Sequence, residues 1–87
     1  MLYRVIIPKS AQKDLNKIQS KFKSRIYTAL GVLATNSFIG KRLEGKYRGQ
    51  WSYRVWPYRI IYQIIKKDLV ILIIHIGHRQ GVYKKNN

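Results

Sequence analysis

The candidate catalytic side chains of this chain are three arginines, a histidine and a tyrosine in its C-terminal half. Arg54 and Arg59 lie in two runs rich in β-branched and aromatic residues, and His78, Arg79 and Tyr83 lie near the end of a third. Guanidinium groups bind phosphate oxygens in pairs, an aromatic ring can stack on a base, and an imidazole can transfer a proton near neutral pH. Such a set suits metal-free cleavage of RNA, in which the 2′-hydroxyl loses a proton and cations stabilise the phosphorane.

Other catalytic chemistries have little support in the residue types. The only acids are Asp14, Glu44 and Asp68, which fall in different predicted elements, whereas two-metal nucleases and glycosidases need converging carboxylates. The chain has no cysteine, which excludes a disulfide scaffold and a zinc–thiolate site. Nothing in the sequence places an acid beside a histidine, and His75, which follows six apolar residues, is expected to be a hydrogen-bonded core or sheet-edge residue. We therefore expect no metal and no cofactor.

The charge balance indicates an anionic partner. Eighteen lysines and arginines face three acids, for a formal net charge of +15. Self-repulsion of this size opposes folding, whereas a polyanion such as nucleic acid converts it into affinity through counterion release. The candidate RNA- or ribosome-binding residues are Lys13, Lys17, Lys41, Arg42, Lys46, Arg48, Lys84 and Lys85. An inert basic surface is the alternative, and a membrane-surface role is weaker because no long helix combines a basic face with an exposed apolar one.

The elements that must position these residues follow from periodicity and chain breaks. Residues 2–7 favour a strand ended by Pro8, and Ser10 is the expected N-cap of a first helix. Apolar residues at helical spacing continue to about residue 36, with a break near residues 19–20 that separates two helices. Residues 37–49, with three glycines and four bases, are expected to form a flexible basic loop that suits single-stranded nucleic acid.

Residues 50–83 predict a three-stranded antiparallel meander, interrupted at Trp56–Pro57 and at residues 66–68. The order β-α-α-β-β-β predicts an α+β fold with both helices on one face of a small, mainly antiparallel sheet. Arg59 then sits at the end of a sheet face that is apolar further along, an uncomfortable position without an anionic partner. We expect one domain over residues 1–87 with a frayed tail at 84–87, and a cytoplasmic protein, because the apolar runs are too short to span a bilayer.

Three stretches resemble the RelE/ParE superfamily of bacterial and archaeal toxins: R-L-E-G, then W-S-Y-R-V-W-P-Y-R-I-I-Y-Q-I, then G-H-R-Q-G-V-Y. The resemblance covers nearly the whole chain. It implies a RelE-like fold and the toxin of a type II toxin–antitoxin system, neutralised by a RelB-like antitoxin. For the RelE branch it further implies a metal-independent endoribonuclease that cleaves mRNA in the ribosomal A site and so inhibits translation.

The resemblance also implies roles for individual residues. By position, Arg59 is similar to the family arginine that stabilises the transition state. Arg79 matches the arginine assigned to the leaving group or phosphate, and Tyr83 matches the tyrosine that stacks on and orients the substrate. The joint presence of these three favours a nuclease over a ParE-like inhibitor of DNA gyrase, which shares the fold but acts by binding protein. A non-catalytic RNA-binding module is favoured by the net charge alone.

The general base is the part of the implied mechanism that the sequence leaves open. Arg54 falls where family members carry a basic strand residue, often lysine, and Ser52 falls near a second such position. Without a lysine there, Arg54, His78 or a loop lysine such as Lys46 could substitute. Arginine holds its proton too firmly to act as a base, whereas histidine titrates near neutral pH. His78 is therefore our hypothesis for proton transfer.

Overall fold

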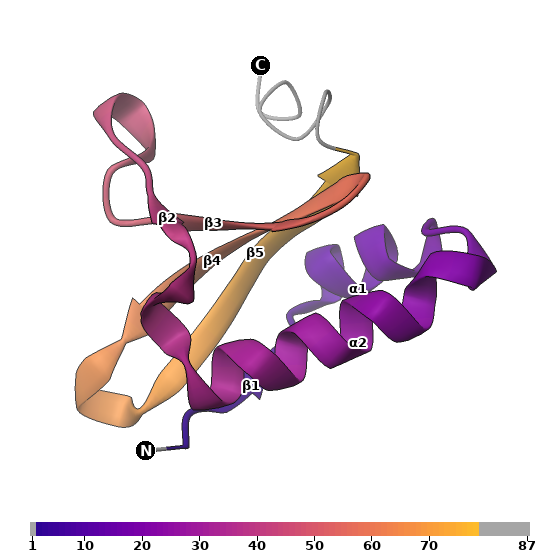
Figure 1. Cartoon of the computed structure of the whole chain (residues 1–87). Coiled ribbons are helices and arrows are strands. Elements are labelled where there is room, and N and C mark those ends of the chain that lie inside the picture. The colour runs from indigo at the N-terminus through magenta and orange to yellow at the C-terminus, as the bar shows by residue number, and fades with distance from the viewer. Residues whose placement is uncertain (1, 79–87) are drawn as a thin grey trace.

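Two helices lie against one face of a five-stranded sheet in the structure, a computed structural model that describes residues 2–78 (Figure 1). The sheet order is β1-β5-β4-β3-β2, with β1 parallel to β5 and the other neighbours antiparallel. The elements are β1 (Arg4–Ile6), α1 (Lys9–Asn16), α2 (Ser20–Thr35), β2 (Lys41–Arg42), β3 (Trp51–Val55), β4 (Tyr58–Ile65) and β5 (Val70–His78). The predicted α+β fold, the pair of helices and the antiparallel meander are confirmed.

The start of α1 differs from the sequence prediction. Ser10 lies inside the helix, and Pro8 occupies the N-cap position with φ −63° and ψ 167°. The Gln12 amide donates to the Pro8 carbonyl at 2.9 Å, so the helical hydrogen bonds begin two residues earlier than predicted. Proline already holds the required φ and needs no amide partner, which makes a capping hydroxyl at Ser10 unnecessary.

The hydrophobic core lies between the helices and the sheet. Its largest fully buried side chains are Ile26, Leu33, Ile60, Tyr62, Ile71, Ile73 and Ile76. In β4, Ile60 and Tyr62 face the helices, so the alternate positions Arg59 and Ile61 project from the opposite side. We call this side, which also bears Arg54, the outer face.

A β-bulge in β5 inverts which side chains of that strand reach the core. Ile61 pairs with His75 but Tyr62 pairs with Ile73, so Ile74 is an extra residue in the ladder. One inserted residue moves every later side chain to the other face of a strand. Ile73 before the bulge and Ile76 after it therefore both pack in the core, although an unbroken strand would point them to opposite faces.

The segment from residue 37 to residue 49 is more ordered than the flexible loop that the sequence predicts. It contains the short strand β2, which pairs with the start of β3. The buried Tyr62 hydroxyl donates to the Ser37 carbonyl at 2.8 Å and accepts from the Gly40 amide at 3.2 Å. A Cβ on Gly40 would lie 2.5 Å from the Tyr62 oxygen, so glycine permits this approach. The prediction of a flexible loop is thus only partly right, because hydrogen bonds to Tyr62 hold the start of this segment against the core.

Candidate active site

Two of the predicted site residues, Arg54 on β3 and Arg59 on β4, lie directly opposite each other. They are partners in the antiparallel register, just before and after the Trp56–Pro57 turn. Side chains of such partners leave the same face of the sheet, with Cβ atoms about 5 Å apart. Their neighbours Tyr53 and Ile60 pack against or within the core, so both arginines project from the outer face.

Neither arginine has a carboxylate partner within residues 2–78. Arg59 is half-buried and its Nη1 donates to the buried Ser52 hydroxyl at 3.3 Å, whereas Arg54 is exposed. In this part of the chain no Asp or Glu oxygen lies within 4.0 Å of either guanidinium group. Like charges directly opposite each other destabilise an antiparallel pair. An anion bound between the two would remove this repulsion and would gain charge-assisted hydrogen bonds from both.

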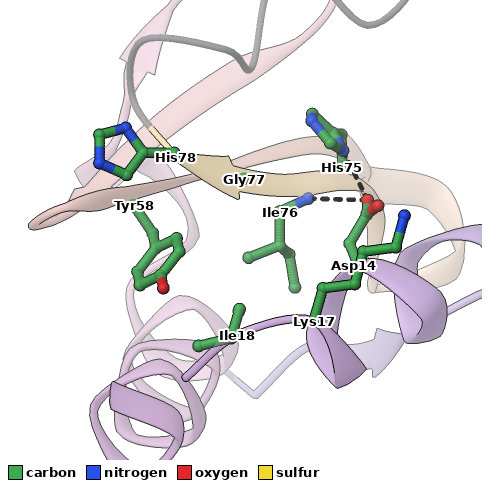
Figure 2. Close-up of a pocket in the computed structure, with 8 residues that line it drawn as sticks. All are labelled: Asp14, Lys17, Ile18, Tyr58, His75, Ile76, Gly77 and His78. Atoms are coloured by element: carbon green, nitrogen blue, oxygen red, sulfur yellow. Dashed lines mark hydrogen bonds and ion pairs between the residues drawn. The ribbon is translucent and has the colours of Figure 1, made fainter. Parts of the chain in front are cut away.

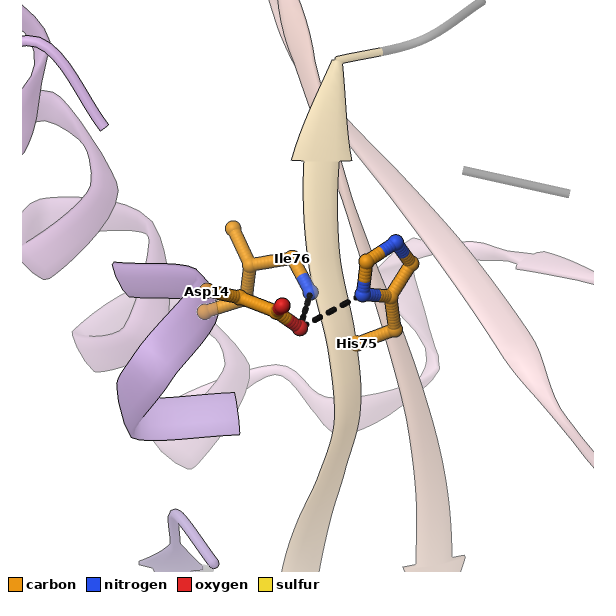
Figure 3. A network of polar contacts seen from close by, with 3 residues as sticks. All are labelled: Asp14, His75 and Ile76. Carbon is orange, nitrogen blue, oxygen red and sulfur yellow. Dashed lines mark hydrogen bonds and ion pairs between the residues drawn. The ribbon is translucent and has the colours of Figure 1, made fainter. Parts of the chain in front are cut away.

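A buried carboxylate orients a histidine at the neighbouring edge of the sheet. His75 Nδ1 donates to Asp14 Oδ2 at 2.5 Å, and the Ile76 amide donates to the same oxygen at 3.2 Å (Figure 3). The side chain of Asp14 is 5% exposed and that of His75 is 15% exposed. The expectation that His75 is a hydrogen-bonded sheet-edge residue is confirmed. The expectation that no acid lies beside a histidine is wrong, because folding brings Asp14 across a separation of 61 residues.

The ring of His75 lies over Gly77 on the outer face. A Cβ on Gly77 would come within 2.8 Å of His75 Nε2, so the ring occupies the space that a side chain at this position would need. Figure 2 shows the ring on the opposite side of β5 from the core residue Ile76. Gly77 is the register partner of Arg59, which in turn faces Arg54. One row across three strands thus carries an imidazole and two guanidinium groups.

His78, the predicted proton-transfer residue, lies at the exposed end of β5 beside Tyr58 instead. Its register partner is Tyr58, and the two ring centroids are 6.1 Å apart. Tyr58 packs against Phe22 of α2. A pocket of about 460 Å³ beside it is lined by His78 and Lys17, and at the edge of β5 also by His75 and Gly77 (Figure 2). The bulge explains this position, since one inserted residue exchanges the faces of the side chains that follow it in β5. The structure therefore does not bring His78 to the pair formed by Arg54 and Arg59.

Six of the predicted RNA- or ribosome-binding residues are described, and all six are exposed: Lys13, Lys17, Lys41, Arg42, Lys46 and Arg48. The structure brings Arg42 and Arg48 together at a surface pocket of about 390 Å³, whose lining includes Phe38, Trp51 and Lys66. The ring centroids of Phe38 and Trp51 are 5.4 Å apart, and Lys66 Nζ lies 5.8 Å from the Phe38 centroid. Cations and aromatic faces meet here, as in proteins that bind single-stranded nucleic acid.

The remaining predicted site residues, Arg79, Tyr83, Lys84 and Lys85, lie outside the described residues, and their roles stay predictions. Within residues 2–78, no three His, Cys, Asp or Glu side chains gather in a group that could hold a metal ion. In the same part of the chain, neither helix has the length and apolar composition needed to cross a membrane.

The chain matches a known family over most of its length. A family described as "ParE toxin of type II toxin-antitoxin system, parDE" matches residues 5–83. The chain belongs to the RelE/ParE toxin superfamily. Toxin RelE of Mycobacterium tuberculosis is 31% identical over 97% of this chain and 89% of the relative. Toxin RelG of the same organism is 28% identical over 98% of this chain and 100% of the relative.

Solved structures of RelE proteins share the fold of this chain. The crystal structure of the RelBE2 toxin–antitoxin complex from Mycobacterium tuberculosis contains a chain with a TM-score of 0.85 and 27% identity, covering 91% of this chain and 100% of the other. An archaeal RelE–RelB complex from Pyrococcus horikoshii OT3 gives a TM-score of 0.72 and 30% identity, covering 91% and 97%. The RelE-like fold is confirmed, and the chain is a toxin of a type II toxin–antitoxin system.

The pair that sequence reasoning missed in this RelE/ParE toxin is Asp14 with His75. The sequence did contain an indication for Asp14: it lies between the apolar positions Ala11 and Leu15 of α1, both buried, where a carboxylate needs a buried partner. The identity of that partner could not be deduced, because it depends on how α1 packs on β5.

Proposed function

We propose that this toxin is an endoribonuclease that cleaves mRNA in the A site of the ribosome, without a metal ion, and thereby inhibits translation. The observation that carries the proposal is the cross-strand pair of Arg54 and Arg59, which has no carboxylate partner among residues 2–78. Two planar guanidinium groups on one face of the sheet can donate paired hydrogen bonds to the non-bridging oxygens of a phosphodiester. The similarity to toxins named RelE and RelG supports the RelE branch.

The two arginines would act in different ways on the same phosphate. Arg59 is half-buried and held by Ser52, so its guanidinium is oriented before the substrate arrives and can stabilise the charge that develops on the phosphorane. Arg54 is exposed and can adjust to the bound RNA. Arg79 and Tyr83 are proposed to contact the leaving group and to stack on the substrate, as the family resemblance implies.

The basic surface is proposed to dock the toxin on rRNA and mRNA. The basic residues proposed to make these contacts are Lys13, Lys17, Lys41, Arg42, Lys46, Arg48, Lys84 and Lys85. The first six are exposed, and the last two lie outside the described residues. The net charge of +15 would steer the toxin to the ribosome at a rate that falls as salt is added.

A RelB-like antitoxin is the proposed protein partner, and the cytoplasm, where ribosomes translate, is the proposed location. Both of the similar structures described above, RelBE2 and the archaeal RelE–RelB complex, are toxin–antitoxin complexes. A surface with a net charge of +15 favours a partner that is acidic where it covers the arginines.

Primer extension on a translated message tests the function. We expect the purified toxin to produce discrete stops inside codons, only when ribosomes are present. Arg59→Gln should remove the stops, whereas Lys67→Gln, which removes an exposed charge in the turn between β4 and β5, should retain them. An intact message together with inhibited DNA supercoiling would overturn the proposal in favour of a ParE-like gyrase inhibitor. An intact message with RNA binding alone would indicate a non-catalytic module.

A further inference from the structure

We propose that His75, oriented by Asp14, accepts the proton of the attacking 2′-hydroxyl, a role that rests on the function proposed above. The general base was the component that the sequence could not assign. The ring of His75 lies over Gly77, the register partner of Arg59, whereas His78 lies at the end of β5 beside Tyr58. His75, which the β-bulge turns to the side of the arginines, therefore takes the role that the sequence suggested for His78.

The bond to Asp14 selects which nitrogen of His75 is basic. A carboxylate can only accept, so the neutral ring bonded to Asp14 Oδ2 carries its hydrogen on Nδ1. The lone pair then resides on Nε2, the nitrogen that lies over Gly77. Figure 3 shows this nitrogen turned along β5 toward the carboxyl end of the strand, away from the carboxylate.

The distance across the strands suits one nucleotide. Neighbouring strands are about 4.8 Å apart, so the positions of Gly77 and Arg54 are separated by roughly 10 Å, with Arg59 between them. A phosphodiester bound by the two arginines has a ribose on each side, and the proposal requires that the ribose with the attacking 2′-hydroxyl lies at the Gly77 end of this row. The side chain of His75 is 15% exposed while Asp14 is 5% exposed, so the imidazole can meet a substrate that the carboxylate does not touch.

The step assigned to His75 is a transesterification. Nε2 takes the proton of the 2′-hydroxyl, the bond between the 2′-oxygen and phosphorus forms, and the bond between phosphorus and the 5′-oxygen breaks. The 5′-oxygen takes a proton from water, and the imidazolium later returns its proton to the solvent, so no proton is gained or lost overall. The products are a 2′,3′-cyclic phosphate and a 5′-hydroxyl. Asp14 stabilises the imidazolium as a positioning residue, while Arg59 and Arg54 stabilise the phosphorane.

Gly77 makes this arrangement possible. Any side chain at this position would collide with the ring, since even a Cβ would meet Nε2 at 2.8 Å and Cε1 at 3.2 Å. Asp14 Oδ2 accepts from both the Ile76 amide and His75 Nδ1, so one buried oxygen ties the ring to the backbone of β5.

Single-turnover cleavage on programmed ribosomes tests the proposal. We expect His75→Ala and His75→Gln to cleave at least ~100-fold more slowly than the wild type, the usual loss when a general base is removed, with unchanged binding to ribosomes. Added imidazole should restore part of the rate of His75→Ala, which a merely structural role would not allow. Lys67→Gln, in the turn between β4 and β5, is the control and should retain the wild-type rate. A loss of rate in His78→Gln, with the His75 variants unaffected, would overturn the proposal. Circular dichroism and Tm verify folding, and the glutamine retains a donor for Asp14.

The positioning role of Asp14 is tested in a double-mutant cycle. Asp14→Asn should slow cleavage when His75 is present and should have no further effect in the His75→Ala background, because the two act as one unit. Equal losses in both backgrounds would overturn the positioning role. The proposal would be overturned if the wild type cleaves mRNA and the His75 variants cleave at the same rate. It would also be overturned if added imidazole does not raise the rate of His75→Ala. A wild type that leaves mRNA intact would instead refute the proposed function.

Discussion

Replacing Arg54 by glutamine is expected to stabilise the folded toxin while it weakens cleavage. Arg54 is exposed and faces Arg59 directly, and within residues 2–78 its side chain has no ion pair to lose. Two unit charges 6 Å apart in water repel by about 0.7 kcal/mol, and cross-strand pairs in proteins contribute about 0.2–1 kcal/mol. We therefore expect the free energy of unfolding to rise by about 0.5 kcal/mol at low salt, with an increase in Tm of a few degrees.

Urea unfolding at two salt concentrations measures this effect. The Debye length falls from about 30 Å at 0.01 M to about 3 Å at 1 M salt, so the gain should nearly vanish at the higher concentration. Lys67→Gln is the control, because it lowers the net charge equally but lies in the turn between β4 and β5. A stabilisation of Arg54→Gln no larger than that of Lys67→Gln, or one that persists at 1 M salt, would refute the reasoning that the two arginines repel each other.

Three further predictions concern stability. Tyr62→Phe should lower the free energy of unfolding in urea by about 1–3 kcal/mol, because the Ser37 carbonyl and the Gly40 amide lose their shared partner; an unchanged midpoint would contradict this. Burial raises the pKa of the Tyr62 phenol above its ordinary value of 10.0, although the Gly40 amide lowers it. Because the folded-state pKa is the higher one, the stabilisation that the Tyr62 hydroxyl provides is complete below a pH of about 10 and is lost as the pH rises through the folded pKa. The difference in Tm between the wild type and Tyr62→Phe should therefore shrink at high pH, and a constant difference would contradict this. Gly31→Ala should stabilise the exposed side of α2 by about 1 kcal/mol in a thermal melt, since no atom lies within 4 Å of the added Cβ, and a lower Tm would contradict it.

Local patterns in the sequence were sufficient to predict the two helices, the strands β3 to β5 and the proximity of Arg54 and Arg59, but not the short strand β2. Turn residues separate β3, β4 and β5, and the two-residue period of a strand predicts that Arg59 leaves the face opposite to Ile60. The short Trp56–Pro57 turn makes the two strands antiparallel neighbours, which places Arg54 near Arg59. These conclusions need only the two-residue period of a strand and the reach of a tight turn.

The histidines could not be placed in this way, because their orientation depends on one inserted residue. Ile71 and Ile73 face the core, and unbroken alternation from them would send His75 inward and His78 to the outer face. The extra residue at Ile74 reverses both. A run of consecutive isoleucines, leucines and valines carries no period from which such a bulge could be predicted.

The central claim of this account is that Arg54 and Arg59 together hold the scissile phosphodiester of mRNA. Single-turnover cleavage of one message on programmed ribosomes, by Arg54→Gln, Arg59→Gln and the double variant, tests it most directly. We predict at least ~100-fold slower cleavage for Arg59→Gln and ribosome binding within a few-fold of the wild type. The loss in the double variant should be smaller than the product of the two single losses. Cleavage by Arg59→Gln and by the double variant at the wild-type rate would contradict it.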